Sequence, residues 1–172
     1  MATHNQWISG TNWICLPKDE IDVWKFPLNL QQDDRTVLSQ DELQDLDRPD
    51  STIKRERRIC GRSHLRRILS LYTESDPSRI SFEYGKNGKP ALSEHPKLSF
   101  NLSHSKNMGL ITIAYSRRIG IDVEHLETER PFSKIAERFL TKNENDFING
   151  HTEEERSRAF YRIWTLNEAY LK

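Results

Sequence analysis

The sequence predicts an α+β fold, in which strands and helices form separate runs along a chain of 172 residues. Three observations support this class. Residues 98–124 contain short apolar and alternating stretches that are typical of strands. Residues 51–72 carry apolar side chains at three- and four-residue steps, as an amphipathic helix does. Two Thr-x-x-Glu capping boxes near the end of the sequence predict the starts of further helices.

The first half of the sequence predicts short strands followed by helices. Residues 1–30 favour strands because tryptophans and branched apolar residues there are interspersed with turn residues. Residues 38–46 predict a short helix, with Ser39 or Asp41 as its N-cap. On the long helix that follows, Arg57 falls on the apolar side, so we expect it to meet an anion or a carboxylate there.

Residues 80–92 predict a strand, a Gly-Lys-Asn-Gly turn and a second extended piece. Residues 98–124 predict three adjacent strands, and we expect the last two to form a tight hairpin through Arg117 and Arg118. The third of these strands alternates cleanly between two faces. Its apolar face consists of Ile119, Ile121 and Val123, and its other face of Gly120, Asp122 and Glu124.

Helices are expected over the rest of the chain. Residues 131–140 form the first, and a capping box at Thr141 opens the second, which stops at Asn149-Gly150. A further capping box at Thr152 opens the last helix, which runs to the end of the sequence.

Composition excludes several classes of protein. The net charge is zero, so the basic field of a nucleic-acid-binding protein is absent. Cys15 and Cys60 lack CxxC spacing, which argues against a zinc site or a disulfide framework and favours a reducing cytoplasm. The longest apolar stretch is too short to cross a membrane, and no signal peptide is evident. We therefore expect a cytoplasmic protein with no membrane or nucleic-acid partner.

Charge is distributed unevenly in spite of the zero total. Residues 33–50 are rich in Asp and Glu, whereas residues 54–67 are rich in Lys and Arg. The basic helix suggests an acidic partner surface, and a solvated helix face explains it nearly as well.

Three carboxylates suggest a metal site. Asp122 and Glu124 repel each other on one strand face, and Glu168 lies one turn before Lys172 on the last helix. If that helix packs beside the strand, three carboxylates form an all-oxygen site that favours magnesium or manganese. Gly120 then leaves room for a ligand to approach. Taken singly, such features are more often solvated edge charges and a surface ion pair than a metal site.

Four short motifs follow one another along the chain. They are GKP at 88–90, FNLSHS at 100–105, GIDVE at 120–124 and FYRIWTLNEAYLK at 160–172. In order and spacing the chain resembles the 4'-phosphopantetheinyl transferases of the surfactin-synthetase type. The resemblance covers roughly residues 55–172.

The resemblance implies a pseudo-twofold pair of similar α+β subdomains. The N-terminal one would span residues 1–115, with the coenzyme A 3'-phosphate and the GKP and FNLSHS motifs. The C-terminal one would span residues 116–172 and hold the metal site. Because the sequence ends at Lys172, inside its last motif, we expect a C-terminally truncated chain whose second half is incomplete. We also expect a monomer.

The resemblance further implies transfer of 4'-phosphopantetheine from coenzyme A to a serine of an apo acyl or peptidyl carrier protein, with release of 3',5'-ADP. Such carriers serve fatty-acid, polyketide or non-ribosomal peptide synthesis. The metal, Mg²⁺ or Mn²⁺, would be held by Asp122, Glu124 and Glu168. The catalytic residues would be Glu168, as general base, and Lys172. Coenzyme A would be bound by Arg57, Lys89, Pro90, Ser103 and His104.

Two alternatives stay open at this point. The chain could be a truncated, catalytically weak or inactive form that still binds coenzyme A or the carrier. It could also be an unrelated magnesium-dependent phosphohydrolase, although no Gly-rich phosphate loop supports that function. One departure from the family pattern is Asn167, where the family usually has lysine, and the lost charge would weaken phosphate binding.

Overall fold

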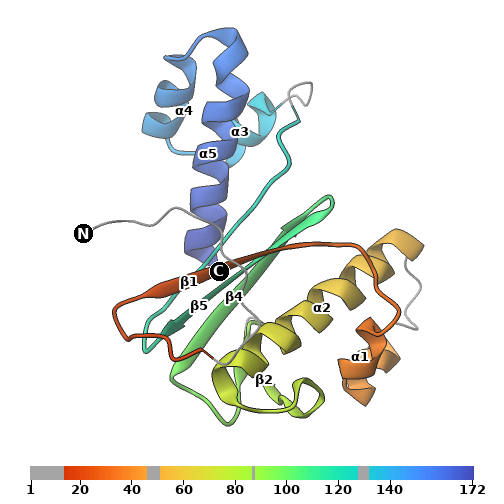
Figure 1. Cartoon of the computed structure of the whole chain (residues 1–172). Helices are drawn as coiled ribbons and strands as arrows, with labels where there is room; N and C mark the ends of the chain where they lie inside the picture. The colour runs from red at the N-terminus through yellow and green to blue at the C-terminus, as the bar shows by residue number, and fades with distance from the viewer. Residues whose placement is uncertain (1–13, 46–50, 87, 128–131) are drawn as a thin grey trace.

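The computed structural model describes residues 14–45, 51–86, 88–127 and 132–172 and confirms the α+β class. A three-stranded antiparallel sheet with a long helix forms one part, and three helices gather beyond one end of the sheet (Figure 1). The strands are β1 Ile21–Pro27, β2 Phe82–Tyr84, β3 Pro90–Leu92, β4 Leu98–Ser105 and β5 Met108–Tyr115. The α-helices are α1 Gln40–Asp45, α2 Thr52–Thr73, α3 Ser133–Phe139, α4 Lys142–Asn149 and α5 Glu153–Leu171. The strands predicted within residues 1–13 lie outside the described residues.

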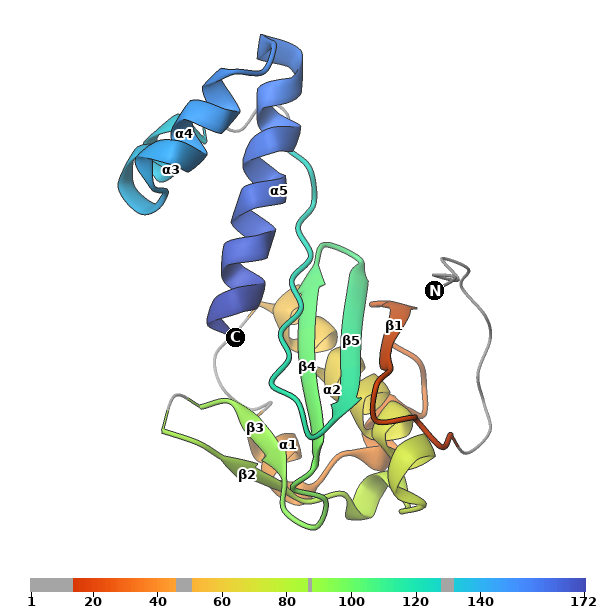
Figure 2. The ribbon, with the colours of Figure 1, turned by 90° about the vertical axis from the view of Figure 1, so that its left-hand side faces the viewer.

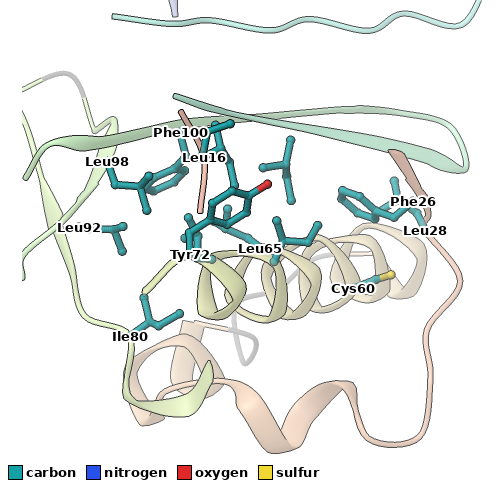
Figure 3. Packing of buried hydrophobic residues seen from close by; sticks show 14 residues of the cluster. Leu16, Phe26, Leu28, Cys60, Leu65, Tyr72, Ile80, Leu92, Leu98 and Phe100 are labelled. Atoms are coloured by element: carbon teal, nitrogen blue, oxygen red, sulfur yellow. The ribbon is translucent and has the colours of Figure 1, made fainter. Parts of the chain in front are cut away.

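The long helix α2 forms as the sequence predicts. Ser51 caps it by accepting a hydrogen bond from the Lys54 N–H at 3.4 Å. The apolar stripe of α2 packs against one face of the sheet and builds the main core (Figure 3). Leu65 and Leu69 are almost fully buried there, and each contributes about 1.5–3 kcal/mol of hydrophobic stabilisation.

The sheet has the strand order β1-β5-β4. Ser105 pairs with Met108, so β4 and β5 form a tight hairpin, in which Lys106 has a φ of 51°. On its other edge β5 pairs with β1. The hairpin therefore joins the first two of the three strands predicted in residues 98–124, and the prediction of a hairpin through Arg117 and Arg118 is wrong.

Residues 119–124 form no strand, which corrects the second part of that prediction. The edge of β5 that a third strand would have taken is filled by β1. The chain instead turns back after β5 and runs alongside β4, on the side of the sheet away from α2 (Figures 1 and 2). We call residues 119–125 the crossing segment.

The acidic and basic stretches of the sequence pair with each other inside the chain. Glu42 on α1 forms salt bridges with Arg66 at 2.7 Å and Arg62 at 3.1 Å on α2. Asp34, which is fully buried, pairs with Arg67 on the same helix at 2.5 Å. Much of the charge asymmetry thus serves internal packing, which neither interpretation of the basic helix anticipated.

The last three helices form a second cluster of apolar side chains. Both predicted capping boxes are present, at Thr141 with Glu144 and at Thr152 with Glu155. The first half of α5 packs with α3 and α4, whereas its last turns run back to the crossing segment (Figure 2). The buried members of this cluster are Ala136, Leu140, Ile148, Ala159, Phe160 and Tyr161.

The main core and the second cluster share no residue. A boundary between two subdomains at residue 115 stays a prediction. None of the helices in the described part of the chain could span a membrane.

Candidate active site

The crossing segment is attached to β4 through side chains. The backbone N–H groups of Ile121, Val123 and His125 donate to side chains of β4 at 2.8, 3.3 and 3.0 Å. The acceptors are the Asn101 amide oxygen, the Ser103 hydroxyl and the Ser105 hydroxyl, respectively. Each bond joins residues 20 apart in sequence, so the segment runs parallel to β4 in a constant register.

Two carboxylates of the crossing segment are held by the same serines. The Ser103 hydroxyl donates to Oδ1 of Asp122 at 2.8 Å, and the Ser105 hydroxyl donates to Oε2 of Glu124 at 3.1 Å. The other oxygen of Asp122, Oδ2, is buried and has no hydrogen-bond partner among the described residues. A buried carboxylate oxygen without a partner is costly in a folded protein, so it marks a place where a cation or donor fits.

The end of α5 meets the crossing segment at Gly120. A Cβ atom on Gly120 would lie 1.9 Å from the carbonyl oxygen of Ala169, which no real structure tolerates. The missing side chain thus lets the backbone of α5 approach closely. This corrects the expectation that Gly120 leaves space for a ligand.

Lys172 is brought to Asp122 by this contact. Its ammonium lies 2.5 Å from Oδ1 of Asp122, and it also donates to the Ser103 hydroxyl at 3.0 Å and the Ile121 carbonyl at 3.4 Å. The Asp122 side chain is 6% exposed and that of Lys172 is 30% exposed, so the ion pair is largely shielded from water.

Glu168 lies one turn before Lys172 but does not complete a metal site here. Its side chain is half-buried and forms no hydrogen bond or ion pair with any described residue. Within residues 14–45, 51–86, 88–127 and 132–172, no group of three or more His, Cys, Asp and Glu side chains is arranged to hold a metal ion. Asp122 and Glu124 share one segment, and Glu168 remains apart from them.

A cleft of about 240 Å³ lies between α2 and β4. Three of the predicted coenzyme A residues, Arg57, Pro90 and His104, line it. Arg57 is half-buried, and its guanidinium donates to the Asn107 side chain at 3.5 Å. Arg58 and Arg62 also line the cleft, and guanidinium groups suit it to phosphate, although Arg62 is already paired with Glu42.

Two other predicted coenzyme A residues lie outside this cleft. Ser103 is buried and bound to Asp122 and Lys172, because neighbouring side chains on a strand point to opposite faces. Lys89 donates to the Ile119 carbonyl at 3.0 Å. Burial, and then the charge of Arg118, lower the pKa of Lys89 below its ordinary value.

Asn167 points away from the crossing segment. Its amide donates to the Glu144 carboxylate at 2.8 Å and so ties α5 to the capping box of α4. This bond, followed by those from Thr141, lowers the pKa of Glu144.

Sequence reasoning missed the roles of Asn101 and Ser105. Both belong to alternate positions of the FNLSHS motif, and polar side chains at every second position of a strand mark one face of it. This two-residue period of polar side chains was the signal available in the sequence. It marks one face of the strand but does not identify the segment that packs on that face.

The comparisons with known proteins match this region of the chain. Residues 118–172 match the family model of the 4'-phosphopantetheinyl transferase superfamily. The chain is 36% identical to the 4'-phosphopantetheinyl transferase HetI of a Nostoc species, over 96% of this chain and 73% of the relative. The chain belongs to the 4'-phosphopantetheinyl transferase superfamily.

Further members of this superfamily are similar over shorter lengths. The 4'-phosphopantetheinyl transferase Sfp of Bacillus subtilis is 32% identical over 67% of this chain and 50% of its own length. AcpT of Salmonella typhimurium, a 4'-phosphopantetheinyl transferase, is 31% identical over 70% of this chain and 59% of its own length. The chain thus spans between half and three quarters of these three relatives.

Proposed function

We propose that the chain transfers the 4'-phosphopantetheine group of coenzyme A to a serine of an apo acyl or peptidyl carrier protein and releases 3',5'-ADP. The observation that carries this proposal is the meeting of all four sequence motifs at the crossing segment. Lys89 of GKP and Lys172 of the last helix donate to its carbonyls, and the alternate side chains of FNLSHS accept from its N–H groups. The segment itself contains GIDVE.

The cleft beside α2 is the proposed site for the phosphates of coenzyme A. A guanidinium binds phosphate through two parallel hydrogen bonds, and we assign the 3'-phosphate to Arg57. His104 and Pro90 line the same cleft. Lys89 and Ser103 lie nearer the crossing segment, where we assign them to the pyrophosphate side of the coenzyme.

We assign the metal ion, Mg²⁺ or Mn²⁺, to Asp122 and Glu124, with Glu168 as the third ligand. The partnerless Oδ2 of Asp122 and the all-oxygen set of donors fit a hard cation. When bound, such an ion polarises phosphoryl oxygens and offsets their negative charge.

The protein's own groups then have defined tasks. The Glu168 carboxylate takes the proton of the carrier serine as the serine oxygen attacks the phosphorus that bears pantetheine. The bond from that phosphorus to the 3',5'-ADP oxygen breaks, and the Lys172 ammonium offsets charge on the departing phosphate.

Intact-mass spectrometry of an apo carrier protein tests the proposal. With coenzyme A and Mg²⁺ present, we expect the carrier to gain the mass of one phosphopantetheine group. Asp122→Ala should abolish the gain while leaving the main core folded, because this side chain faces away from that core. No gain with the wild-type chain over hours would contradict the proposal, as would full activity of Asp122→Ala.

One observation favours a second function, in which the chain binds coenzyme A or a carrier with little or no turnover. Lys172 neutralises Asp122, and no three-carboxylate group is assembled among the described residues. Calorimetry separates the two functions. The binding form would show coenzyme A affinity that falls in Arg57→Ala, together with no mass gain on the carrier.

A further inference from the structure

The FNLSHS strand and the crossing segment share a repeating hydrogen-bond unit. Each of Ser103 and Ser105 accepts from the backbone N–H of the residue 20 positions later. Each also donates its own hydrogen to the carboxylate 19 positions later, Asp122 or Glu124. The unit occurs twice at a spacing of two residues, which is the side-chain period of both extended chains.

No backbone-to-backbone hydrogen bond holds the crossing segment to any described residue. Its N–H groups bond to Asn101, Ser103 and Ser105, and its carbonyls bond to Lys89 and Lys172. The position of the segment relative to the sheet therefore depends on side chains, which a substitution can remove one at a time.

We infer that Asn101, Ser103 and Ser105 are positioning residues that aim the two carboxylates of the crossing segment at the metal. The role of the carboxylates as metal ligands rests on the proposed function. A hydroxyl carries one hydrogen and accepts through its lone pairs. The backbone N–H of the crossing segment donates to a lone pair of the serine oxygen and so sets the orientation of the hydroxyl. The single hydroxyl hydrogen then points at the carboxylate and fixes its orientation.

Such outer partners of metal ligands have measurable effects. Their removal typically weakens metal binding by about 10- to 100-fold, because the ligand is then free to rotate. Ser105 is the best position for the test, since its hydroxyl contacts Glu124 and the His125 N–H and lies outside the coenzyme A residues proposed above.

The experiment measures Mn²⁺ binding to the full chain by electron paramagnetic resonance. We expect Ser105→Ala to weaken binding by about tenfold, and Ser105→Thr, which keeps the hydroxyl, to restore it. Ser99→Ala is the matched control, because Ser99 lies on the same face of β4 and forms no side-chain hydrogen bond with the described residues. Coenzyme A binding without metal should be equal in all four proteins.

Amide exchange followed by nuclear magnetic resonance gives a readout that needs no metal. In Ser105→Ala, the His125 amide should exchange faster, whereas amides of β5 should not change. Unchanged Mn²⁺ affinity or unchanged His125 exchange in Ser105→Ala would overturn the inference. A wild-type chain that binds no Mn²⁺ would overturn the metal assignment itself, and that outcome is distinct because it appears before any substitution is made.

Discussion

Gly120 shows how a single residue can be recognised in a sequence and still be misinterpreted. The sequence shows that this position has no side chain, and a glycine in an extended segment indicates that another group approaches it closely. What fills the space depends on a helix that lies almost 50 residues later, at Ala169. Local pattern predicts the close approach but not the neighbour, because the neighbour is set by the packing of the whole chain.

Substitution of Gly120 tests that packing. In Gly120→Ala the new methyl group overlaps the Ala169 carbonyl, so the end of α5 must shift, at a cost of about 1–3 kcal/mol in unfolding free energy. Chemical denaturation measures the loss. Gly85→Ala is the control, because a Cβ there meets nothing closer than 3.8 Å. Equal stability of the two variants would refute the close contact.

The two cysteines differ in exposure and therefore in reactivity. Cys15 is exposed and Cys60 is fully buried on α2. Burial, together with the charge of Asp34, raises the pKa of the Cys60 thiol to about 11. At pH 8 the Cys60 side chain is therefore a protonated thiol, which is a poor nucleophile.

Alkylation of the native chain at pH 8 should label one cysteine. Intact mass after iodoacetamide treatment should show one added group on the native chain and two after denaturation. Cys15→Ser should remain unlabelled when native. Rapid native labelling of Cys15→Ser would show that Cys60 is accessible and would contradict the burial.

At the scale of elements, the helices and the pairing of β4 with β5 were predictable, whereas the third strand of the sheet was not. The stripe of apolar residues and Ser51 define α2, and Thr141 and Thr152 define the starts of α4 and α5, because these signals are local. The alternation of residues 119–124 is equally clear, yet these residues form no strand. Alternation describes an extended chain with two faces, whereas pairing depends on which sheet edge is still free.

The contact between α1 and α2 could not be predicted from the local sequence pattern of either helix. Arg66 is 2% exposed and pairs with Glu42, which also pairs with Arg62. Removing the charge of Glu42 leaves a buried guanidinium without its counter-ion, so Glu42→Gln should lower the unfolding free energy by about 3 kcal/mol. Asp41→Asn, at an exposed position in the same helix, should change it little. A loss no larger than that of Asp41→Asn would show that the buried pair is energetically unimportant.

At the scale of the whole molecule, α5 joins two regions. Its first half belongs to the second apolar cluster, and its last turn places Lys172 on Asp122 of the crossing segment. The family resemblance implied that the last helix approaches these carboxylates, and Lys172 does reach Asp122. The sequence did not predict that Lys172, and not Glu168, would meet Asp122, because helix periodicity gives the shared face but not the rotation of the helix against its neighbour.

A double-mutant cycle on Asp122→Asn and Lys172→Met tests most directly whether the last turn of α5 docks on the crossing segment. Unfolding free energies of the wild type, the two single variants and the double variant give the coupling between the side chains. We expect a coupling of at least about 0.5 kcal/mol, because the pair is largely shielded from water. The exposed pair Lys106 with Glu127, analysed with Lys106→Met and Glu127→Gln, should give less. A coupling near zero between Asp122 and Lys172 would contradict the docking of α5 on the crossing segment.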